Sequence, residues 1–474
     1  MIFQNNLNII LVMNIKEICD QEKILKILRE TENPDKKTIE LILEKAKEKK
    51  GLSLKEVGYL VNLKDKELIE GLFEIAGKIK EEIYGERLVF FAPLYISDYC
   101  VNDCEYCNFH IRNKMKRKKL TLQEIEEETK RIIEMGHKRI LLECGEDPIN
   151  NTIDYVVSAI DTIYSVKIEK GNIRRINVNI AATTVEDYKK LKKAKIGTYQ
   201  LFQETYHYET YKKLHKGPKS DYERQITAHI RAFEGGIDDL GLGVLFGLYD
   251  WRFEVLALVS HAQFLDSHLG VGPHTISVPR FRPAPTVTYQ PEYPVSDFDF
   301  LKIIAILRLA VPYTGMILST RERPEIRKIA FKLGISQTSA GSRTSPGGYR
   351  NFSEKEAQFE IHDLRSLNEV INDILADNLI PSFCTACYRV GRTGEDFMNL
   401  AKPGEIHKFC RPNGILTFVE YLEDFAKTNG KSELYEKGYK VVEYYLDKIG
   451  NEQLKKETIK RIERIKKGER DLYF

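Results

Sequence analysis

Eight short β-rich segments, each followed by a stretch with helical periodicity, constrain the fold of this chain more than any other feature. They are Leu88–Ile96, Arg139–Glu143, Ile176–Ala181, Thr198–Gln203, Leu240–Phe246, Thr275–Phe281, Thr314–Thr320 and Ile335–Ser339. Of the helical stretches between them, Thr121–Met135 and Thr184–Lys195 each begin with a Thr-x-x-acid capping box. An open doubly wound sheet shows the same alternation, but eight unbroken strand–helix units predict closure into a (β/α)8 barrel.

Helices are expected on both sides of the barrel. Before it, helical spacing over Lys36–Lys50, a capping box from Ser53 to Glu56 and a helix over Asp65–Tyr84 predict a helical extension. After it, Ser353–Leu375 is predicted as a helix that starts with its own capping box, and the end of the chain is amphipathic and rich in Lys and Glu. The predicted fold class is α/β: a (β/α)8 TIM barrel over 88–352, an N-terminal helical extension over 1–87 and a C-terminal helical domain over 353–474.

Charge and hydropathy exclude several classes of protein. The 73 Lys and Arg residues nearly balance the 70 Asp and Glu residues, so no dominant field for a polyanion is expected, and no nucleic-acid partner. The apolar run Ile9–Met13 is far shorter than a membrane span and follows no basic segment, so neither a membrane anchor nor a secretory signal is expected. Met13 offers an alternative translation start. The expected compartment is the cytoplasm, where the eight cysteines would stay reduced.

Three cysteines follow the first predicted strand directly. Cys100, Cys104 and Cys107 form a C-x3-C-x2-C pattern, and three thiolates at these intervals can hold three corners of a cubane iron–sulfur cluster. Three protein ligands leave the fourth iron open to a small molecule, and the carboxyl end of a barrel strand is where barrel enzymes place their chemistry. The alternative is zinc with His110 as a fourth ligand, or buried thiols.

The pattern, with Tyr106 before its last cysteine, resembles the radical S-adenosylmethionine (SAM) superfamily. This resemblance implies a [4Fe-4S] cluster on the three cysteines, whose open iron binds SAM and whose reduction releases a 5′-deoxyadenosyl radical. It also implies SAM contacts from Gly145 and Glu146, although Cys144 stands where the family has a first glycine. Further SAM contacts are implied for Glu204, Arg224 and Gly243.

A second cysteine triad lies near the end of the chain. Cys384, Cys387 and Cys410 form C-x2-C-x22-C, which fits a second iron–sulfur cluster and makes the C-terminal domain a cluster-binding one. Structural zinc completed by His407 is the competing interpretation.

The two triads together resemble the HydG family of tyrosine lyases, which mature [FeFe]-hydrogenase, and whose relatives in the ThiH family lack the second triad. Further resemblance lies in 260–263, 272–280 and 339–343. The resemblance implies cleavage of the Cα–Cβ bond of L-tyrosine to p-cresol and dehydroglycine (2-iminoacetate), which yields CO and cyanide on iron at the second cluster. It further implies a labile iron held by a histidine of the barrel's opposite face. His268 is the favoured candidate and His274 the alternative.

Tyrosine needs a partner for its carboxylate, and the bidentate guanidinium of Arg321, at the end of the seventh strand, suits that role. Ser339 and Ser342 can add hydroxyl donors, so these three residues are the catalytic candidates.

The resemblance also implies an electron donor such as ferredoxin or flavodoxin and other hydrogenase-maturation proteins as partners. Two alternatives remain: a ThiH-like 2-iminoacetate synthase for thiazole synthesis, and a non-catalytic iron–sulfur scaffold.

Overall fold

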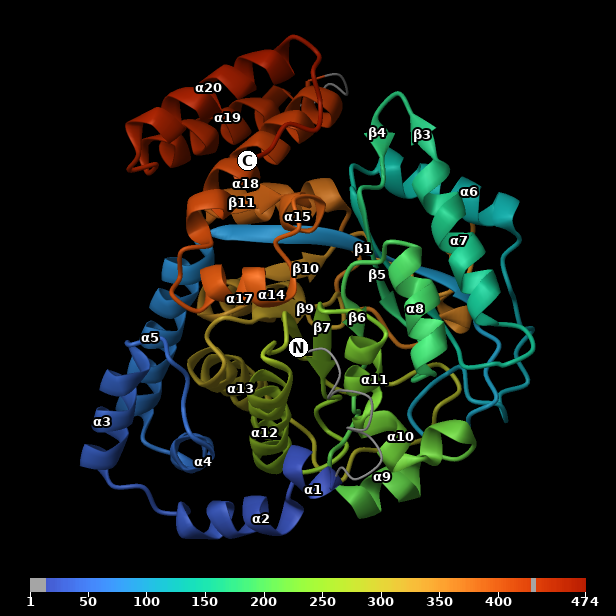
Figure 1. Ribbon diagram of the computed structural model, residues 1–474, viewed down its shortest axis with the longest axis vertical. Coiled ribbons are helices and arrows are strands. Elements are labelled where there is room, and N and C mark those ends of the chain that lie inside the picture. The colour runs from blue at the N-terminus through green and yellow to red at the C-terminus, as the bar shows by residue number, and fades with distance from the viewer. Residues whose placement is uncertain (1–13, 428–431) are drawn as a thin grey trace, which may run out of the picture.

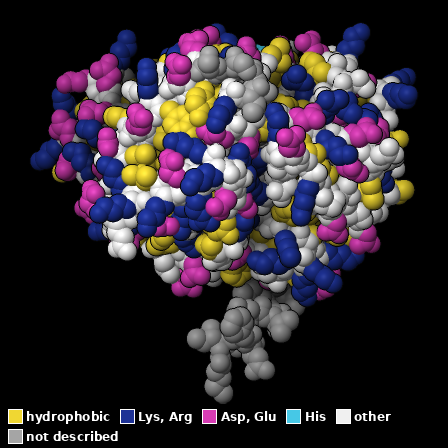
Figure 2. Space-filling model, turned by 90° about the horizontal axis from the view of Figure 1, so that it is seen from above, with side chains coloured by type: hydrophobic (Ala, Val, Ile, Leu, Met, Phe, Trp, Pro, Cys, Tyr) yellow, Lys and Arg dark blue, Asp and Glu magenta, His cyan; other side chains and the backbone are white. Residues whose placement is uncertain are grey.

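The computed structural model describes residues 14–427 and 432–474 (Figure 1). The apolar run Ile9–Met13 and the alternative start at Met13 lie outside the described residues. No helix among the described residues is long and apolar enough to cross a membrane. Figure 2 shows Lys and Arg side chains interspersed with Asp and Glu over one face of the molecule, as the near balance of charges leads one to expect.

Eight parallel strands close into a barrel, which confirms the predicted fold class. They are β1 (Arg87–Ser97), β2 (Arg139–Cys144), β5 (Arg175–Asn179), β6 (Tyr199–Gln200), β7 (Leu240–Gly243), β8 (Thr275–Ser277), β9 (Gly315–Leu318) and β10 (Gln337–Ser339). Each pairs with the next, and β10 returns to β1 through the register Val89–Gln337 to Phe91–Ser339. Each strand overlaps one of the eight predicted segments. A small hairpin of β3 (Lys167–Ile168) and β4 (Gly171–Asn172) stands apart from the barrel.

Helices cover the outside of the barrel. They are α6 (Leu122–Glu134), α7 (Ile153–Ser165), α8 (Val185–Lys193), α11 (Ala228–Glu234), α12 (Trp251–Leu269), α13 (Asp297–Ala310) and α14 (Pro324–Leu333). The capping box at Thr121 is formed in both directions, whereas Thr184 accepts a hydrogen bond from the backbone of Asp187 with no reciprocal bond recorded. Short helices α9 (Tyr208–Leu214), η2 (Pro218–Ser220) and α10 (Tyr222–Ile226) fill the long connection after β6.

The N-terminal helices wrap one side of the barrel (Figure 1). They are α1 (Ile15–Ile18), α2 (Gln21–Glu30), α3 (Lys36–Ala46), α4 (Leu54–Asn62) and α5 (Lys66–Tyr84). The capping box from Ser53 to Glu56 is present, and Asp65 caps the last helix as expected. Buried Lys302 of α13 donates to the carbonyls of Val61 and Leu63 at 3.0 and 2.6 Å, which satisfies the open C-terminus of α4.

The predicted helix over Ser353–Leu375 is wrong for residues 353–366 and right for 367–375. The structure has a short 3-10 turn η3 (Glu354–Glu356), and the helix α15 (Leu367–Ala376) begins only at a capping box of Ser366 and Glu369. Tertiary contacts hold the residues between them outside a helix. The Gln358 backbone donates to Thr344 O and accepts from the Asn108 backbone, and Asp363 is buried against Arg327. The capping pattern occurs at Ser353 and again at Ser366. These contacts prevent a helix from starting at the first of the two.

The C-terminal region adds a strand that the sequence pattern did not predict. β11 (Ile380–Ser382) pairs in parallel with the first residues of β1, from Arg87 to Val89. It is followed by α16 (Ala386–Arg389), α17 (Gly394–Ala401), α18 (His407–Tyr421), the π-helical turn η4 (Leu422–Ala426), α19 (Ser432–Asp447) and α20 (Glu452–Lys466). The division into three domains stays a prediction, with β11 belonging to the same sheet as the barrel strands.

Candidate functional site

The carboxyl ends of the barrel strands surround a pocket with about 1490 Å³ of empty space, part of it open to solvent. Ten of the predicted site residues line it. They are Cys100, Cys104, Tyr106, Cys107, Gly145, Glu146, Glu204, Arg321, Ser339 and Ser342. The fold therefore gathers into one cavity residues that are separated by more than two hundred positions in the chain.

The first triad lies on a loop that is fixed by its backbone. The Val101 N–H donates to Glu146 O at 2.8 Å, and the Glu105 N–H donates to Leu214 O at 3.1 Å. Gly145 packs against this loop so closely that an added Cβ would lie 2.9 Å from the Cβ of Cys100 and would overlap Tyr99 O. The glycine therefore has a packing role beside the SAM contact that the resemblance implies.

The donor set fits an iron–sulfur cluster. Cys104 is buried, while Cys100 and Cys107 are partly exposed toward the pocket. Burial raises the pKa of the Cys107 thiol to about 11, so a metal has to displace the proton when it binds. Tyr106 forms a 2.8 Å hydrogen bond between its hydroxyl and Nε2 of His215, which fixes the aromatic side chain beside the last cysteine.

Two carboxylates beside the triad already have partners. Glu146 pairs with Arg224 at 2.6 Å and accepts from the Asn102 amide at 2.6 Å, so it ties the cysteine loop to α10. Glu204 has a φ of 66°, which is a strained conformation for a glutamate, and it pairs with Lys219 at 2.7 Å. Lys219 lines the pocket, and no spacing or pattern in the sequence had singled it out.

Two predicted SAM contacts do not line this pocket. Arg224 reaches it only through Glu146, and its other hydrogen bond goes to Ala182 O. Gly243 leaves room for the ring of Phe202, which an added Cβ would overlap, and that ring lines the pocket. Gly243 thus acts on the pocket wall through its neighbour.

Arg321 lies at the mouth of the pocket and stacks on Phe359, with its guanidinium carbon 3.3 Å from the ring centroid. Its neighbour Glu322 pairs instead with Arg280 and Arg282, at 2.5 and 2.6 Å. Within the described chain no ion pair involves Arg321, which leaves its charge for a carboxylate ligand. Ser339 and Ser342 are buried at the end of β10, the strand that pairs with β9, and the Ser342 hydroxyl has no hydrogen-bond partner.

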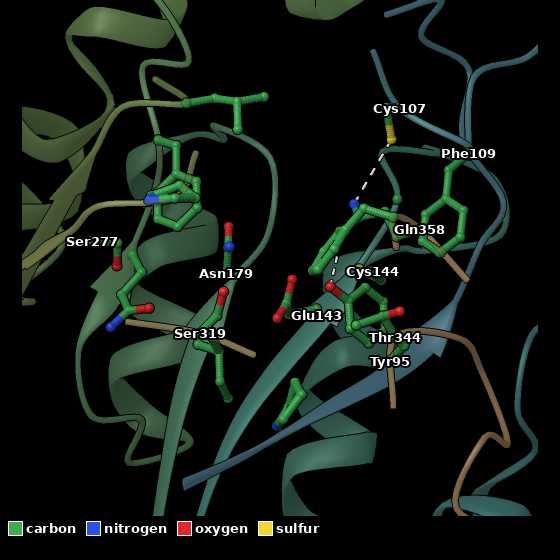
Figure 3. A pocket seen from close by; sticks show the side chains of 18 of the residues that line it. Tyr95, Cys107, Phe109, Glu143, Cys144, Asn179, Ser277, Ser319, Thr344 and Gln358 are labelled. Atoms are coloured by element: carbon green, nitrogen blue, oxygen red, sulfur yellow. Dashed lines mark hydrogen bonds between the residues drawn. The ribbon is translucent and has the colours of Figure 1, made fainter. Parts of the chain in front are cut away.

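A group that the sequence pattern missed faces the same cavity (Figure 3). Glu143 projects from β2 toward Tyr95, which donates to Oε1 of Gln358 at 2.8 Å, and the Gln358 amide lies 3.8 Å from Sγ of Cys107. Burial raises the pKa of Glu143 to about 7, although Tyr95 and Arg321 act in the opposite direction. The period-two alternation of the strand would have pointed this side chain into the barrel.

The second triad lies where the barrel strands begin. Cys384 follows β11, Cys387 lies in α16 and Cys410 in α18. Burial and the charges of Cys410 and Cys384 raise the pKa of Cys387 to about 12, so the three thiols lie within electrostatic reach of one another. Three thiols suit a cubane, which takes each thiolate on a different iron. His407, the predicted zinc ligand, forms a 2.6 Å hydrogen bond from Nδ1 to Gly404 O.

The structure does not bring His268 to this triad. Its ring is half-exposed and stacked on Phe264, and its Nε2 lies 3.7 Å from Glu17 in α1. His274, the alternative, is buried and forms a 3.1 Å hydrogen bond with the hydroxyl of Tyr388, the residue after Cys387. Its buried Nδ1 makes no hydrogen bond and lies 3.4 Å from Oδ1 of Asp239. Burial lowers the pKa of His274 to about 4 although Asp239 acts in the opposite direction, so the imidazole is neutral. These properties suit a metal ligand.

Polar side chains connect the two ends of the barrel. Asn179, Gln200, Ser277 and Ser339 line the pocket, and the Gln200 amide donates to Thr275, the residue after His274, at 3.4 Å. Further down, Thr198 bonds Asp239 and Tyr388, Asp239 pairs with Arg175, and Arg139 donates to Gln337. The interior of the barrel is therefore lined by hydrogen-bonding groups from one triad toward the other.

Comparisons with known proteins agree with this geometry. Residues 94–258 match the family model described as the radical SAM superfamily, and residues 277–380 match the biotin and thiamin synthesis associated domain. A 2-iminoacetate synthase of Salmonella typhimurium is 32% identical over 315 residues, which are 66% of this chain and 82% of that protein.

Two solved structures match over nearly the whole chain. A crystal structure of HydG, a maturase of the [FeFe]-hydrogenase, has a TM-score of 0.93 and 52% identity and covers 97% of this chain and 100% of its own. The maturase HydG from Carboxydothermus hydrogenoformans has a TM-score of 0.84 and 42% identity and covers 96% of this chain and 99% of its own. The likeness therefore includes the C-terminal region that carries the second triad.

Proposed function

This chain belongs to the family of radical SAM enzymes that contains 2-iminoacetate synthase and the HydG maturases, and from that premise we propose that it is a tyrosine lyase of [FeFe]-hydrogenase maturation. It would cleave the Cα–Cβ bond of L-tyrosine to p-cresol and dehydroglycine, which a second site turns into CO and cyanide on iron. The observation that carries this proposal is the pair of cysteine triads at opposite ends of one closed barrel.

The residues present fit the groups that this function requires. Cys100, Cys104 and Cys107 would hold a [4Fe-4S] cluster, which together with SAM supplies a 5′-deoxyadenosyl radical by one-electron reduction. Glu146 and Glu204 line the pocket beside these thiols, where amino and hydroxyl groups of SAM can find acceptors. Barrel residues together with Gln358 and Phe359 wall most of the cavity, which limits the access of water to reactive species.

Tyrosine would bind with its carboxylate on Arg321 and with the hydroxyls of Ser339 and Ser342 as further partners. Loss of one hydrogen atom from the bound substrate allows the Cα–Cβ bond to break into dehydroglycine and a cresol radical. One electron and one proton then complete p-cresol. The Glu143 carboxyl, with its pKa of about 7, can take up or release a proton inside this pocket near neutral pH.

The second triad would hold another [4Fe-4S] cluster and, through His274, an additional labile iron, which supplies the metal that receives CO and cyanide. Dehydroglycine would pass along the polar interior of the barrel, where Asn177, Gln200 and Thr275 offer hydrogen bonds. The electron donor would be a ferredoxin or flavodoxin, and other maturation proteins would receive the iron product. The thiols, free in the structure, suit the reducing cytoplasm.

The test is an iron and acid-labile sulfide analysis of the anaerobically reconstituted chain and of a variant with Cys384, Cys387 and Cys410 all changed to Ala. Each sample is assayed with SAM, dithionite and tyrosine. We expect about nine irons, of which eight belong to two cubanes and one is labile, to fall to about four, with p-cresol and 5′-deoxyadenosine retained and CO lost. About four irons in both samples, with zinc in the parent, would leave a ThiH-like lyase. No p-cresol from either sample would remove tyrosine as substrate.

A further inference from the structure

Arg87, the first residue of β1, contacts the second triad. Its Nη2 donates a hydrogen bond of 3.0 Å to Sγ of Cys410. Figure 1 shows β1, β11 and α18 side by side at this end of the barrel, and the register pairs Arg87 with Ile380 of β11. The same strand ends at Ser97, three residues before Cys100, so it joins the two candidate cluster sites.

The charge of Arg87 has no carboxylate partner in the described part of the chain. Its neighbour Glu86 pairs with Lys448 and Arg411, and the guanidinium of Arg87 lies over the ring of Tyr84. Its Nε is buried and makes no hydrogen bond. Arg87 is half-buried, and a cation that is partly removed from water without a counter-charge is unfavourable, so this position calls for negative charge close by.

The thiols of the second triad are the source of that charge. The guanidinium of Arg87 contacts Cys410 directly, through the 3.0 Å hydrogen bond from Nη2 to Sγ. Among the other arginines at this end, Arg175 pairs with Asp239 at 3.1 Å and Arg139 donates to Gln337 at 3.4 Å. Arg392 lies beside Cys387 through its backbone, and its guanidinium donates to Phe474 O at 2.6 Å.

We propose that Arg87 is the counter-ion of the second iron–sulfur cluster and that its hydrogen bond to Cys410 stabilises the reduced, more negative state of that cluster. This inference rests on the proposed function, which assigns a cluster to this triad. Hydrogen bonds and charges at the cluster sulfurs set its reduction potential, and such outer partners also orient the ligands. Arg87 is thus a positioning residue, which acts on the chemistry through Cys410.

The experiment isolates the second cluster. In the full chain, Cys100, Cys104 and Cys107 are changed to Ala, so that all bound iron reports on the C-terminal triad, and Arg87→Gln, Arg87→Lys and Arg411→Gln are added in turn. Arg411 is the matched control because it follows Cys410 directly and carries the same charge, yet it donates to Lys448 O and pairs with Glu86. The readouts are iron per chain and the fraction of reduced cluster, followed by electron paramagnetic resonance at a fixed potential.

We expect Arg87→Gln to lower the ratio of reduced to oxidised cluster about tenfold, which is about 59 mV for a one-electron couple. Arg87→Lys keeps the charge and should show a smaller loss, and Arg411→Gln should match the parent. An unchanged ratio in Arg87→Gln contradicts the proposal, as does an equal shift in Arg411→Gln. If Arg87→Gln binds no iron, iron retained by Arg87→Lys supports the counter-ion, and iron lost from both contradicts it. Absence of iron from the triple-Ala parent itself would instead refute the second cluster.

Discussion

The guanidinium of Arg321 lies 3.3 Å from the ring centroid of Phe359, at the open end of the barrel. Phe359 belongs to the segment between η3 and α15, so the chain after the last barrel strand returns to hold a residue of the seventh β/α unit in place. Stacking fixes the plane of the guanidinium while leaving its N–H groups for a planar carboxylate.

Replacing Arg321 by Lys should reduce kcat/KM for tyrosine about 10- to 100-fold, mainly through KM. Lysine keeps the charge but loses the bidentate geometry, and a hydrogen bond to a charged group contributes roughly 1.5–3 kcal/mol. The measurement is p-cresol formation over a range of tyrosine concentrations. Arg323→Lys is the control, because Arg323 is exposed and paired with Asp297. Equal behaviour of the two variants would remove Arg321 from substrate binding.

Glu143→Gln should change how stability depends on pH. The pKa of Glu143 is raised from 4.5 to about 7, so between these values the folded protein keeps a proton that the unfolded chain releases. This contribution is full below pH 4.5 and is lost as pH rises through 7; at about 1.4 kcal/mol per pH unit it amounts to at most about 3 kcal/mol. Anaerobic urea unfolding at pH 5, 6 and 7.5 checks this.

Relative to Glu143→Gln, the parent should therefore become less stable as pH rises over that range. Exposed Glu134 provides the control, since Glu134→Gln should follow the parent at every pH. If the parent and Glu143→Gln kept a constant difference, the Glu143 carboxyl would be ionised throughout, and it would hold no proton for the reaction.

Gly145→Ala should cost the protein its first cluster. The added Cβ would overlap Tyr99 O and approach the Cβ of Cys100 to 2.9 Å, so the loop that carries the triad has to shift. We expect iron to fall by about four per chain and formation of 5′-deoxyadenosine to drop below detection, with the second cluster retained. Gly450→Ala, where no atom lies within 4 Å, should behave as the parent. Retained activity would show that the loop tolerates displacement.

His274→Ala and His268→Ala should separate the two candidates for the labile iron. We expect His274→Ala to lose about one iron per chain while both cubanes remain, because His274 bonds Tyr388 beside the second triad. His268→Ala should keep the full complement, since its ring faces Glu17 and solvent. The measurement is iron per chain, combined with electron paramagnetic resonance of the labile site, for both variants. The reverse result would restore the assignment expected from sequence.

The alternation of β-rich and helical segments in the sequence was sufficient to predict the barrel. The strand β2 matches its predicted segment to within one residue, because a run of buried residues forms most of it. Thr121 starts its helix through a capping box that involves only neighbours in sequence. Ser353 and Ser366 begin equally good capping boxes thirteen positions apart, and only contacts of Gln358 and Asp363 with distant residues decide between them.

The candidate site also contains residues that the sequence identifies and residues that only the fold reveals. The six cysteines of the two triads were identifiable as candidate ligands because their spacing is a property of the sequence. Glu143, Lys219 and Arg87 could not be identified from the sequence. A glutamate, lysine or arginine becomes a candidate only when the fold places it beside a cavity or a thiol. His268 and His274 are six positions apart, and the choice between them required the position of Tyr388, which belongs to the distant C-terminal region.

The pairing of β11 with β1 has a consequence for chains that end earlier. β2 pairs with β1 only from Ala92 onward. The earlier residues of β1, from Arg87 to Val89, pair instead with β11. Removing β11 would leave an uncovered sheet edge at the bottom of the barrel, of the kind that recruits strands from other molecules. The segment that delivers the second set of thiols therefore also covers an edge of the barrel sheet, and a truncation before β11 would expose that edge.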